Sequence, residues 1–288
     1  MTHSETDIPS VVGVLHPGKM GVTIASALVG GGHSVYWASQ GRSSDTASRA
    51  QLAHLNDITS LESLCLESQY VFSICPPDQA ANIALKVATC GFKGVYIDCN
   101  AVSPGTAKQV ADIVTQQGAT CVDGGIIGPP VSSAGTTRLY LSGKSASSVA
   151  TLLADSLVDA RVIGSGIGEA SALKMAYAGW TKGAMALLMT QFALARQQNV
   201  ESALLAECLL SQPGLEDKLM HACRASAPKA WRFIGEMQEI ADTLEHAELP
   251  RGWFDAAAES YQRLSEFKNQ SDVDHRDVID ALLRPGYS

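Results

Sequence analysis

Short apolar runs alternate with helical patterns over the first half of the chain. Strands alternating with helices predict a parallel sheet with helices on both faces. The predicted fold class is therefore α/β, a doubly wound Rossmann-type parallel sheet domain followed by an all-α domain. The runs predicted as strands are Val11–Leu15, Val35–Ala38, Tyr70–Cys75, Val95–Cys99, Cys121–Asp123 with Ile126–Ile127, Thr137–Gly143 and Ala160–Ser165.

The pattern changes after Gly168. One long apolar helix is predicted from Ala170 to about Gln198, and the rest of the chain also has helical patterns, broken at prolines. A helix that is apolar all round is typically buried, so we expect this one to be covered on several sides. We predict a dinucleotide-binding domain over residues 1–166 and a helical substrate and dimerisation domain over residues 167–288.

Composition narrows the class of protein. The chain has 288 residues, of which 46% are hydrophobic and 17% charged, and this is typical of a globular protein. A net charge of −8 argues against a nucleic-acid partner. No apolar run is long enough for a membrane span, and the N-terminus does not resemble a secretory signal. Seven scattered cysteines without a C-x-x-C pair indicate reduced thiols, a cytoplasmic location and no metal site.

A glycine loop joins the first predicted strand to the first helix. Gly18 lets the backbone approach a pyrophosphate, and Gly21 lets the helix pack closely on the strand. Free N–H groups and the helix dipole then favour an anion, although a plain strand-to-helix turn is the alternative. The predicted cofactor-binding residues of this loop are Leu15, His16, Pro17, Gly18, Lys19 and Met20.

The end of the second predicted strand bears on the choice of cofactor. NAD-specific folds usually have an acidic residue here, but the first acid in this chain is Asp45. Ser39, Gln40 and Arg42 instead provide neutral donors and a guanidinium, which suits a 2′-phosphate. We therefore favour NADP(H) over NAD(H), with a solvated Arg42 as the alternative.

Four segments, GVLHPGKMG, DCNAVSP, DGGIIGPP and GEASALKMAYAGWTKG, follow one another in this order. Together they resemble the β-hydroxyacid dehydrogenase superfamily, which includes 6-phosphogluconate and 3-hydroxyisobutyrate dehydrogenases and, more distantly, imine reductases. The resemblance is closest to 6-phosphogluconate-dehydrogenase-like proteins whose helical C-terminal domain has no assigned function. It implies an oxidoreductase that transfers hydride between nicotinamide and a small hydroxy or carbonyl substrate. With the residues after the second strand, we expect an NADP(H)-dependent enzyme.

The same resemblance implies a set of site residues. The catalytic lysine of the family matches Lys174, the general acid or base, and Asn100 orients the substrate or the nicotinamide amide. The nicotinamide is expected near Cys75, Pro76 and Pro77, in a cleft between the two domains. The residues expected to bind the substrate are Gly124, Gly125, Ile126, Lys174 and Trp180.

Two departures from the family pattern keep alternatives open. The serine and last glycine that grip a carboxylate in the family are Ile127 and Pro129 here, and proline lacks an N–H. The family's asparagine four residues after the lysine is Ala178, so Tyr177 or Lys182 is the candidate replacement. C=N reduction of the imine reductase or reductive aminase type, and an inactive nucleotide-sensing protein, are the alternatives.

Two further expectations concern the long helix. Lys174 stands among apolar neighbours, where a lysine can deliver the proton that hydride transfer requires, or simply pair with Glu169 or the cofactor. The helix also needs more cover than the remaining chain supplies, so we expect a homodimer through the helical domain.

Overall fold

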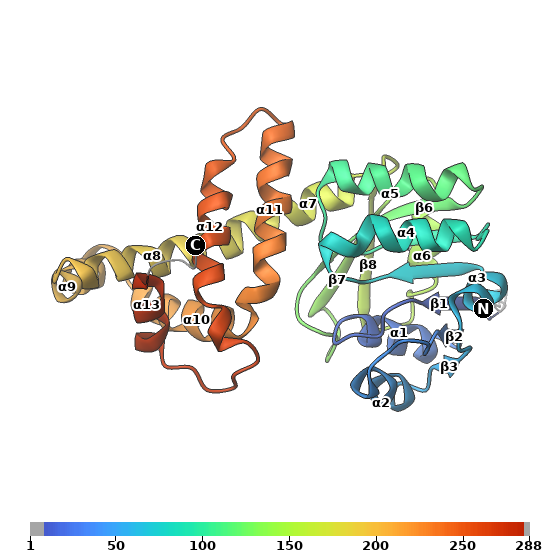
Figure 1. Cartoon of the computed structure of the whole chain (residues 1–288), viewed down its shortest axis with the longest axis horizontal. Coiled ribbons are helices and arrows are strands. Elements are labelled where there is room, and N and C mark those ends of the chain that lie inside the picture. Colours follow the sequence, from blue (N-terminus) through green and yellow to red (C-terminus); the bar gives the residue numbers. More distant parts are fainter. Residues whose placement is uncertain (1–8, 285–288) are drawn as a thin grey trace, which may run out of the picture. The chain divides into compact units, whose positions relative to one another are not determined.

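The computed structural model describes residues 9–284 and divides the chain into two compact units (Figure 1). The first unit ends at Lys174 and the second begins at Met175. The first unit therefore extends beyond residue 166, the predicted end of the first domain, and includes the start of the long helix.

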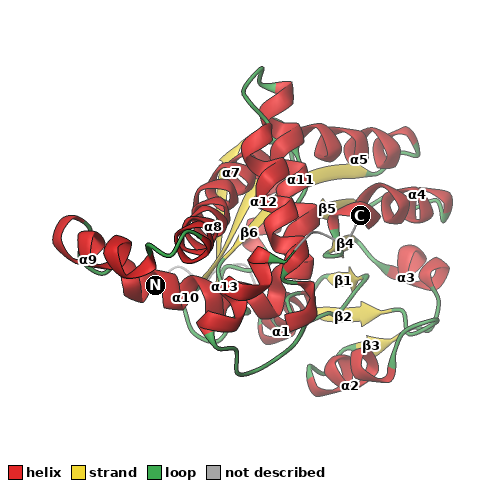
Figure 2. Ribbon diagram, turned by 60° about the vertical axis from the view of Figure 1, so that its left-hand side comes forward, coloured by secondary structure: helices red, strands yellow, loops and turns green. Residues whose placement is uncertain are grey.

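An eight-stranded sheet forms the first unit, with the strand order β3-β2-β1-β4-β5-β6-β7-β8. Every neighbouring pair is parallel except β6 and β7, which run antiparallel. Figure 2 shows strands β3, β2, β1 and β4 side by side. The strands are β1 Val11–Val14, β2 Ser34–Trp37, β3 Asn56–Asp57, β4 Tyr70–Ser73, β5 Val95–Asp98, β6 Thr120–Ile127, β7 Thr137–Ser142 and β8 Val158–Gly164.

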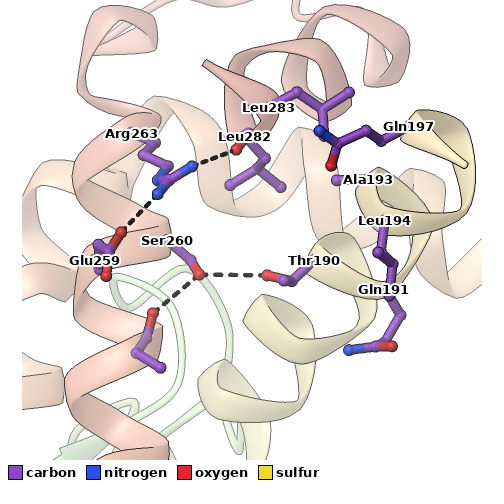
Figure 3. A pocket seen from close by; sticks show the side chains of 11 residues that line it. Thr190, Gln191, Ala193, Leu194, Gln197, Glu259, Ser260, Arg263, Leu282 and Leu283 are labelled. Atoms are coloured by element: carbon purple, nitrogen blue, oxygen red, sulfur yellow. Dashed lines mark hydrogen bonds and ion pairs between the residues drawn. The ribbon is translucent and has the colours of Figure 1, made fainter. Parts of the chain in front are cut away.

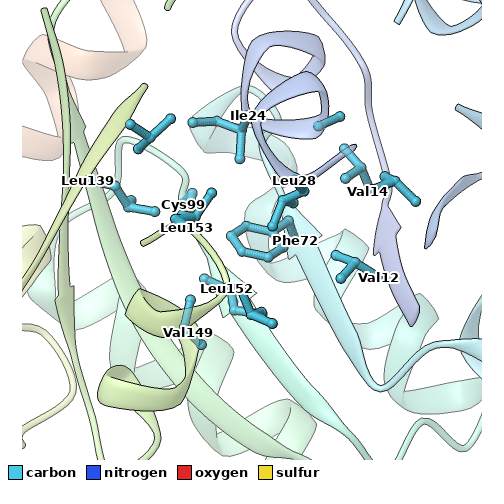
Figure 4. Close-up of a cluster of buried hydrophobic side chains, with 14 of the residues drawn as sticks. Val12, Val14, Ile24, Leu28, Phe72, Cys99, Leu139, Val149, Leu152 and Leu153 are labelled. Atoms are coloured by element: carbon cyan, nitrogen blue, oxygen red, sulfur yellow. The ribbon is translucent and has the colours of Figure 1, made fainter. Parts of the chain in front are cut away.

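Helices cover both faces of this sheet, which confirms the predicted doubly wound α/β fold. Consecutive residues of a strand point to opposite faces, so Val71 and Phe72 enter two separate cores. In Figure 4 the Phe72 ring lies among Leu28, Leu152 and Leu153 on one face. The helices are α1 Gly21–Gly30, α2 Ser44–Leu52, α3 Leu61–Glu67, α4 Ala80–Thr89, α5 Pro104–Gln116 and α6 Ala146–Thr151, with a 3₁₀ turn η1 at Pro77–Gln79.

The sheet differs from the prediction in three places. Strand β6 runs without a break through Gly124 and Gly125, because its residues pair continuously with β7. The antiparallel β6–β7 pair departs from an all-parallel sheet. Helix α2 and the short strand β3 were not predicted, since both are polar and mostly exposed.

The predicted long helix consists of three pieces rather than one. Helix α7 (Glu169–Ala178) passes into a π turn η2 (Gly179–Gly183) and then into α8 (Ala184–Gln197). The π turn packs on Phe254, because a Cβ added at Gly183 would lie 2.8 Å from that ring. Within this single chain the predicted cover is incomplete, since Trp180 is 76% and Leu194 50% exposed, while Met175, Met189 and Phe192 are buried.

The second unit is helical throughout the part that the structure describes. Lys182 of the π turn pairs with the carboxylate of Glu236 and lies over the ring of Phe233. The Tyr261 hydroxyl donates to the Lys182 carbonyl at 2.7 Å. The other elements of the second unit are α9 Glu201–Ser211, α10 Leu215–Ser226, α11 Ala230–His246, α12 Gly252–Arg263 and α13 His275–Leu283, with 3₁₀ turns η3 Ala227–Lys229 and η4 Ser265–Phe267.

Among residues 9–284, no helix combines the length and the apolar character that a membrane span requires.

Candidate functional site

The loops that follow β1, β2, β4 and β5 gather at one edge of the sheet. The Leu15 N–H donates to the Phe72 carbonyl at 3.1 Å, and the Cys99 N–H donates to the Ser73 carbonyl at 2.9 Å. The ends of β1, β4 and β5 are therefore held in register. The strand order reverses between β1 and β4, and the carboxyl edge at such a switch point is where doubly wound sheets bind ligands.

The glycine loop turns tightly before α1. The Gly18 N–H donates to the His16 carbonyl at 2.7 Å, and a Cβ added at Gly21 would lie 2.3 Å from that same oxygen. Helix α1 has no acidic residue in its first turn, and within the described chain no side chain caps it. The first N–H groups of a helix lack intrahelical acceptors, so this start suits an anion.

His16 lies at the centre of this loop. Burial, together with the positive charges of Arg42 and Lys86, lowers its pKa to about 4. Its Nδ1 atom is buried and finds no hydrogen-bond partner within residues 9–284. A buried polar atom ordinarily has a partner, so this nitrogen fits a group that binds at the loop. The glycine cradle, the uncapped helix start and the cationic side chains all fit the diphosphate of a dinucleotide.

The chain after β2 presents the predicted 2′-phosphate residues. The Arg42 N–H donates to the Ser39 carbonyl at 3.0 Å, and the Gln40 N–H donates to the Thr59 carbonyl at 2.9 Å. The turn requires a glycine at position 41, where φ is +73°. Partial burial lowers the pKa of Arg42 from its usual high value, which still leaves a guanidinium at neutral pH.

Arg49 on α2 supports the glycine loop, although sequence reasoning missed it. Its Nε donates to the Pro17 carbonyl at 3.3 Å, and its Nη2 donates to the Thr46 hydroxyl at 2.9 Å. Ser43 caps the same helix by accepting the Thr46 N–H at 3.3 Å. No sequence motif indicates this role, because it depends on a turn and helix that the sequence pattern did not predict.

Asn100 is buried and its amide is used by the protein itself. The Oδ1 atom accepts the Cys75 N–H at 2.6 Å, and Nδ2 donates to the Ser73 hydroxyl at 3.2 Å. Asp98 holds the Asn100 backbone by accepting its N–H at 3.1 Å. Asn100 thus ties the loop after β5 to the loop after β4, where Pro76 precedes the 3₁₀ turn that begins at Pro77.

Lys174 belongs to the first unit and contacts strand β6. Its Nζ donates to the Ile126 carbonyl at 2.8 Å. A Cβ added at Gly125 would lie 2.8 Å from the Ala170 carbonyl and 3.2 Å from the Lys174 Cβ, so glycine lets α7 approach the strand. Gly124 is likewise buried, and a Cβ there would meet the Cys99 sulfur at 2.7 Å.

Asp123 was singled out only as the first residue of the predicted substrate segment. It is 1% exposed and directly precedes the two glycines of β6. Its Oδ2 accepts the N–H groups of Gly168 and Ser171, each at 3.0 Å, and its Oδ1 accepts the Ser171 hydroxyl at 2.6 Å. The carboxylate therefore caps the start of α7.

Two predicted residues, Tyr177 and Trp180, belong to the second unit. Both are exposed, by 46% and 76%, and Trp180 lies in the π turn. The second unit also contains a cavity of about 380 Å³ between α8, α12 and α13 (Figure 3). The Thr190 and Ser260 hydroxyls lie 3.3 Å apart in its wall, and none of the predicted site residues lines it.

Comparisons with known proteins give two family matches. Residues 11–154 match the NAD binding domain of 6-phosphogluconate dehydrogenase, and residues 195–264 match a domain of unknown function (DUF1932). These matches confirm the resemblance predicted from the four sequence segments. No curated protein is a significant match to the chain.

Solved structures share this arrangement of elements over nearly the whole chain. A conserved protein of unknown function, described as structurally similar to 3-hydroxyacid dehydrogenases, is 26% identical with a TM-score of 0.68, covering 91% of this chain and 100% of its own. The 3-hydroxyisobutyrate dehydrogenase of Mycobacterium tuberculosis is 17% identical with a TM-score of 0.70, covering 96% and 100%. A reductive aminase from Aspergillus terreus is 16% identical with a TM-score of 0.56, covering 95% and 99%.

Proposed function

Because the chain belongs to the family defined by the NAD binding domain of 6-phosphogluconate dehydrogenase, we propose that it is an NADP(H)-dependent oxidoreductase of the β-hydroxyacid dehydrogenase type. Its substrate would be a small hydroxy or carbonyl compound. The observation that carries this proposal is the position of Lys174, whose Nζ is hydrogen-bonded at the end of strand β6.

The first unit supplies the residues that would hold the cofactor. The backbone of Gly18, Lys19 and Met20 would face the diphosphate, with His16 beside it. The nicotinamide would lie toward Cys75 and the following prolines, whose loop Asn100 fixes. The bound cofactor would donate or accept the hydride.

Lys174 would handle the proton that accompanies hydride transfer. In the direction of reduction, its ammonium group gives a proton to the substrate oxygen as the C=O bond becomes C–OH, and solvent water restores that proton. In the direction of oxidation, the neutral amine takes the hydroxyl proton. General acid–base catalysis of this kind contributes about 10²- to 10⁴-fold to a rate.

The main test is the oxidation of NADPH with panels of aldehydes, keto acids and cyclic imines. We expect Lys174→Ala to lower kcat by about 10³-fold while the Kd for NADPH stays within about threefold of wild type. Lys144→Ala removes an exposed lysine of the same unit and serves as the matched control. Equal activity of Lys174→Ala and wild type on a confirmed substrate would contradict the assignment.

The preference for NADP(H) rests on Arg42 and on the absence of an acid between Trp37 and Ser44. We expect Arg42→Ala to raise the Kd for NADPH by about 30-fold and to leave the Kd for NADH nearly unchanged, because only NADPH carries the 2′-phosphate. Isothermal titration calorimetry measures both constants. A variant that loses affinity for both cofactors equally would contradict a role at the 2′-phosphate.

Reduction of C=N bonds is the second candidate. It is favoured by the buried Ile127, which stands where the family grips a carboxylate, and by the reductive aminase that was solved in complex with cyclohexanone and allyl amine. Turnover of cyclic imines but not of keto acids would establish it. Tight NADPH binding without turnover, unaltered by Lys174→Ala, would instead identify a nucleotide-sensing protein.

We also propose a homodimer through the helical unit. Leu187 and Leu194 lie seven residues apart within α8 and are each about half exposed, so they form one apolar face that a second helix could cover. Trp180, in the π turn before α8, is 76% exposed. Tyr177 and Trp180 stay predictions as site residues. Light scattering of the purified protein measures the mass, and a monomer at all concentrations would contradict the dimer.

A further inference from the structure

The carboxylate of Asp123 makes four hydrogen bonds in the interior of the first unit. Three come from the start of α7: the Gly168 N–H, the Ser171 N–H and the Ser171 hydroxyl. The fourth comes from the Ser142 hydroxyl at 3.2 Å. A carboxylate that accepts this many bonds is firmly held and is a strong acceptor for helix N–H groups.

Strand β7 completes the same attachment. In the antiparallel β6–β7 pair, Ser142 lies directly opposite Asp123. The Ser142 hydroxyl donates to Asp123 and also accepts the Ala170 N–H at 3.1 Å. Two side chains on adjacent strands therefore bind three backbone amides at the start of α7: that of Gly168, just before the helix, and those of Ala170 and Ser171 in its first turn.

Other helices of this unit are capped differently. Ser60 caps α3 by accepting the Ser63 N–H at 3.1 Å, and Ser103 caps α5 by accepting the Thr106 N–H at 3.1 Å. Those caps lie three residues from the amide that they bind, whereas Asp123 lies 45 residues before Gly168 in the chain. A local cap stabilises only the first turn of its own helix. The Asp123 cap also fixes where α7 begins relative to the sheet, because Asp123 lies on strand β6.

Lys174 lies three residues after Ser171, so about one helical turn separates it from the cap. Its Nζ bonds to Ile126, which follows Asp123 on the same strand, and Gly125 allows the close approach between them. Helix α7 is thus attached to β6 at Asp123, at Gly125 and at Ile126.

We propose that Asp123 is a positioning residue that sets the location of Lys174 on strand β6. The proposal rests on the function of Lys174 proposed above. An alanine at this position would remove both carboxylate oxygens and leave the four donors without this acceptor. The first turn of α7 would then detach from the sheet, and Lys174 would lose its fixed position.

The test compares Asp123→Ala with Ser60→Ala, which removes the cap of a helix that carries no predicted site residue. Ser171→Ala is a milder second variant that keeps the carboxylate and removes one hydrogen bond. Two measurements need no turnover: amide hydrogen exchange over residues 166–175, and the rate at which an acylating reagent modifies Lys174, both followed by mass spectrometry. The kinetic constants kcat and KM are measured alongside.

We expect Asp123→Ala to accelerate exchange in this segment by more than about tenfold and to change the acylation rate of Lys174 by more than about threefold. Ser171→Ala should shift both in the same direction by less, and Ser60→Ala should shift neither. On an active substrate, kcat should fall while the KM for cofactor stays within about twofold.

Exchange and acylation rates that stay at the wild-type values in both Asp123→Ala and Ser171→Ala would overturn the proposal, as would an equal change in Ser60→Ala. If no variant and no wild-type protein turns over any substrate, the proposed function fails, while exchange and acylation still decide the positioning role.

Discussion

Two helices of the first unit begin beside the sheet in opposite ways. Helix α1 follows β1 through a glycine loop, and within the described chain no side chain caps it. Helix α7 begins against β6, and the buried Asp123 accepts two of its first amides. The positive end of a helix dipole is therefore left for a ligand at α1 and is neutralised by the protein at α7.

This difference shows how one physical property serves two purposes. A helix start that the protein satisfies internally is rigid and cannot bind an anion. A helix start that lacks a cap gives up stability in the free protein but offers its N–H groups to phosphate oxygens. The charges near each helix start agree with this difference. Lys19, Arg42 and Lys86 lie in the loops and helices around the start of α1, where their positive charge favours an anionic ligand. At α7 the negative charge is supplied by the protein itself, as the carboxylate of Asp123.

The largest effect is expected from removing the internal cap. Asp123→Ala leaves two amides and two hydroxyls of the interior without an acceptor, so we expect the free energy of unfolding to fall by about 4 kcal/mol. Urea denaturation of the wild-type and variant proteins measures this difference in the free energy of unfolding. Ser60→Ala, which removes a local cap, should cost only about 1 kcal/mol. A loss of similar size in both variants would erase the distinction between the two kinds of cap.

A smaller effect is expected from giving α1 the charge that α7 has. Lys19 is exposed, so Lys19→Glu should leave the fold intact while it places a carboxylate at the start of α1. We expect the Kd for NADPH to rise by about 30-fold, and by only about threefold in Lys19→Gln. Calorimetry at two salt concentrations checks this, because the effect should shrink as salt increases. Unchanged affinity in Lys19→Glu would indicate that the diphosphate binds elsewhere.

The smallest effect concerns pH. The pKa of His16 is lowered to about 4 in the folded protein, first by burial and then by Arg42 and Lys86. Between pH 6.5, the ordinary pKa of histidine, and pH 4, the unfolded chain binds a proton at His16 that the folded protein does not bind. The folded state is therefore most stable above pH 6.5 and loses stability as the pH falls from 6.5 to 4. His16→Gln should reduce this acid-induced loss by about 1 kcal/mol, since a partly exposed group is screened.

Denaturation curves of wild type and His16→Gln at pH 7 and pH 4.5 measure the difference. The same loss of stability in both proteins would mean that His16 keeps its ordinary pKa in the fold.

The sequence predicts the first unit well because its signals are local. Apolar runs of four to five residues become strands, and the glycine loop requires Gly21 for the close approach to the His16 carbonyl. Helix α2 escapes prediction because it has only one buried residue, Ala50, and is held by contacts of Ser43 and Arg49 that no periodicity reveals.

The candidate site is predicted only in part. The family resemblance directs attention to Lys174 and Asn100, but it does not indicate that both polar atoms of the Asn100 amide bind the protein's own loops. Asp123 belongs to a recognised segment, yet its partners are 19 to 48 residues away in the chain. Contacts of that kind depend on the antiparallel turn from β6 to β7, which the pattern of apolar runs cannot distinguish from another parallel crossover.

The π turn at Gly179–Gly183 has a consequence for anyone who aligns this chain with its relatives. A π turn contains about one residue more than an α turn, and one residue corresponds to about 100° of rotation around a helix axis. Periodicity counted through the turn assigns Leu187 and the residues after it to the wrong side of the helix. A relative with a regular helix here needs a one-residue gap, and deletion of Thr181 should convert the π turn into an α turn while the later side chains of α8 keep their present neighbours.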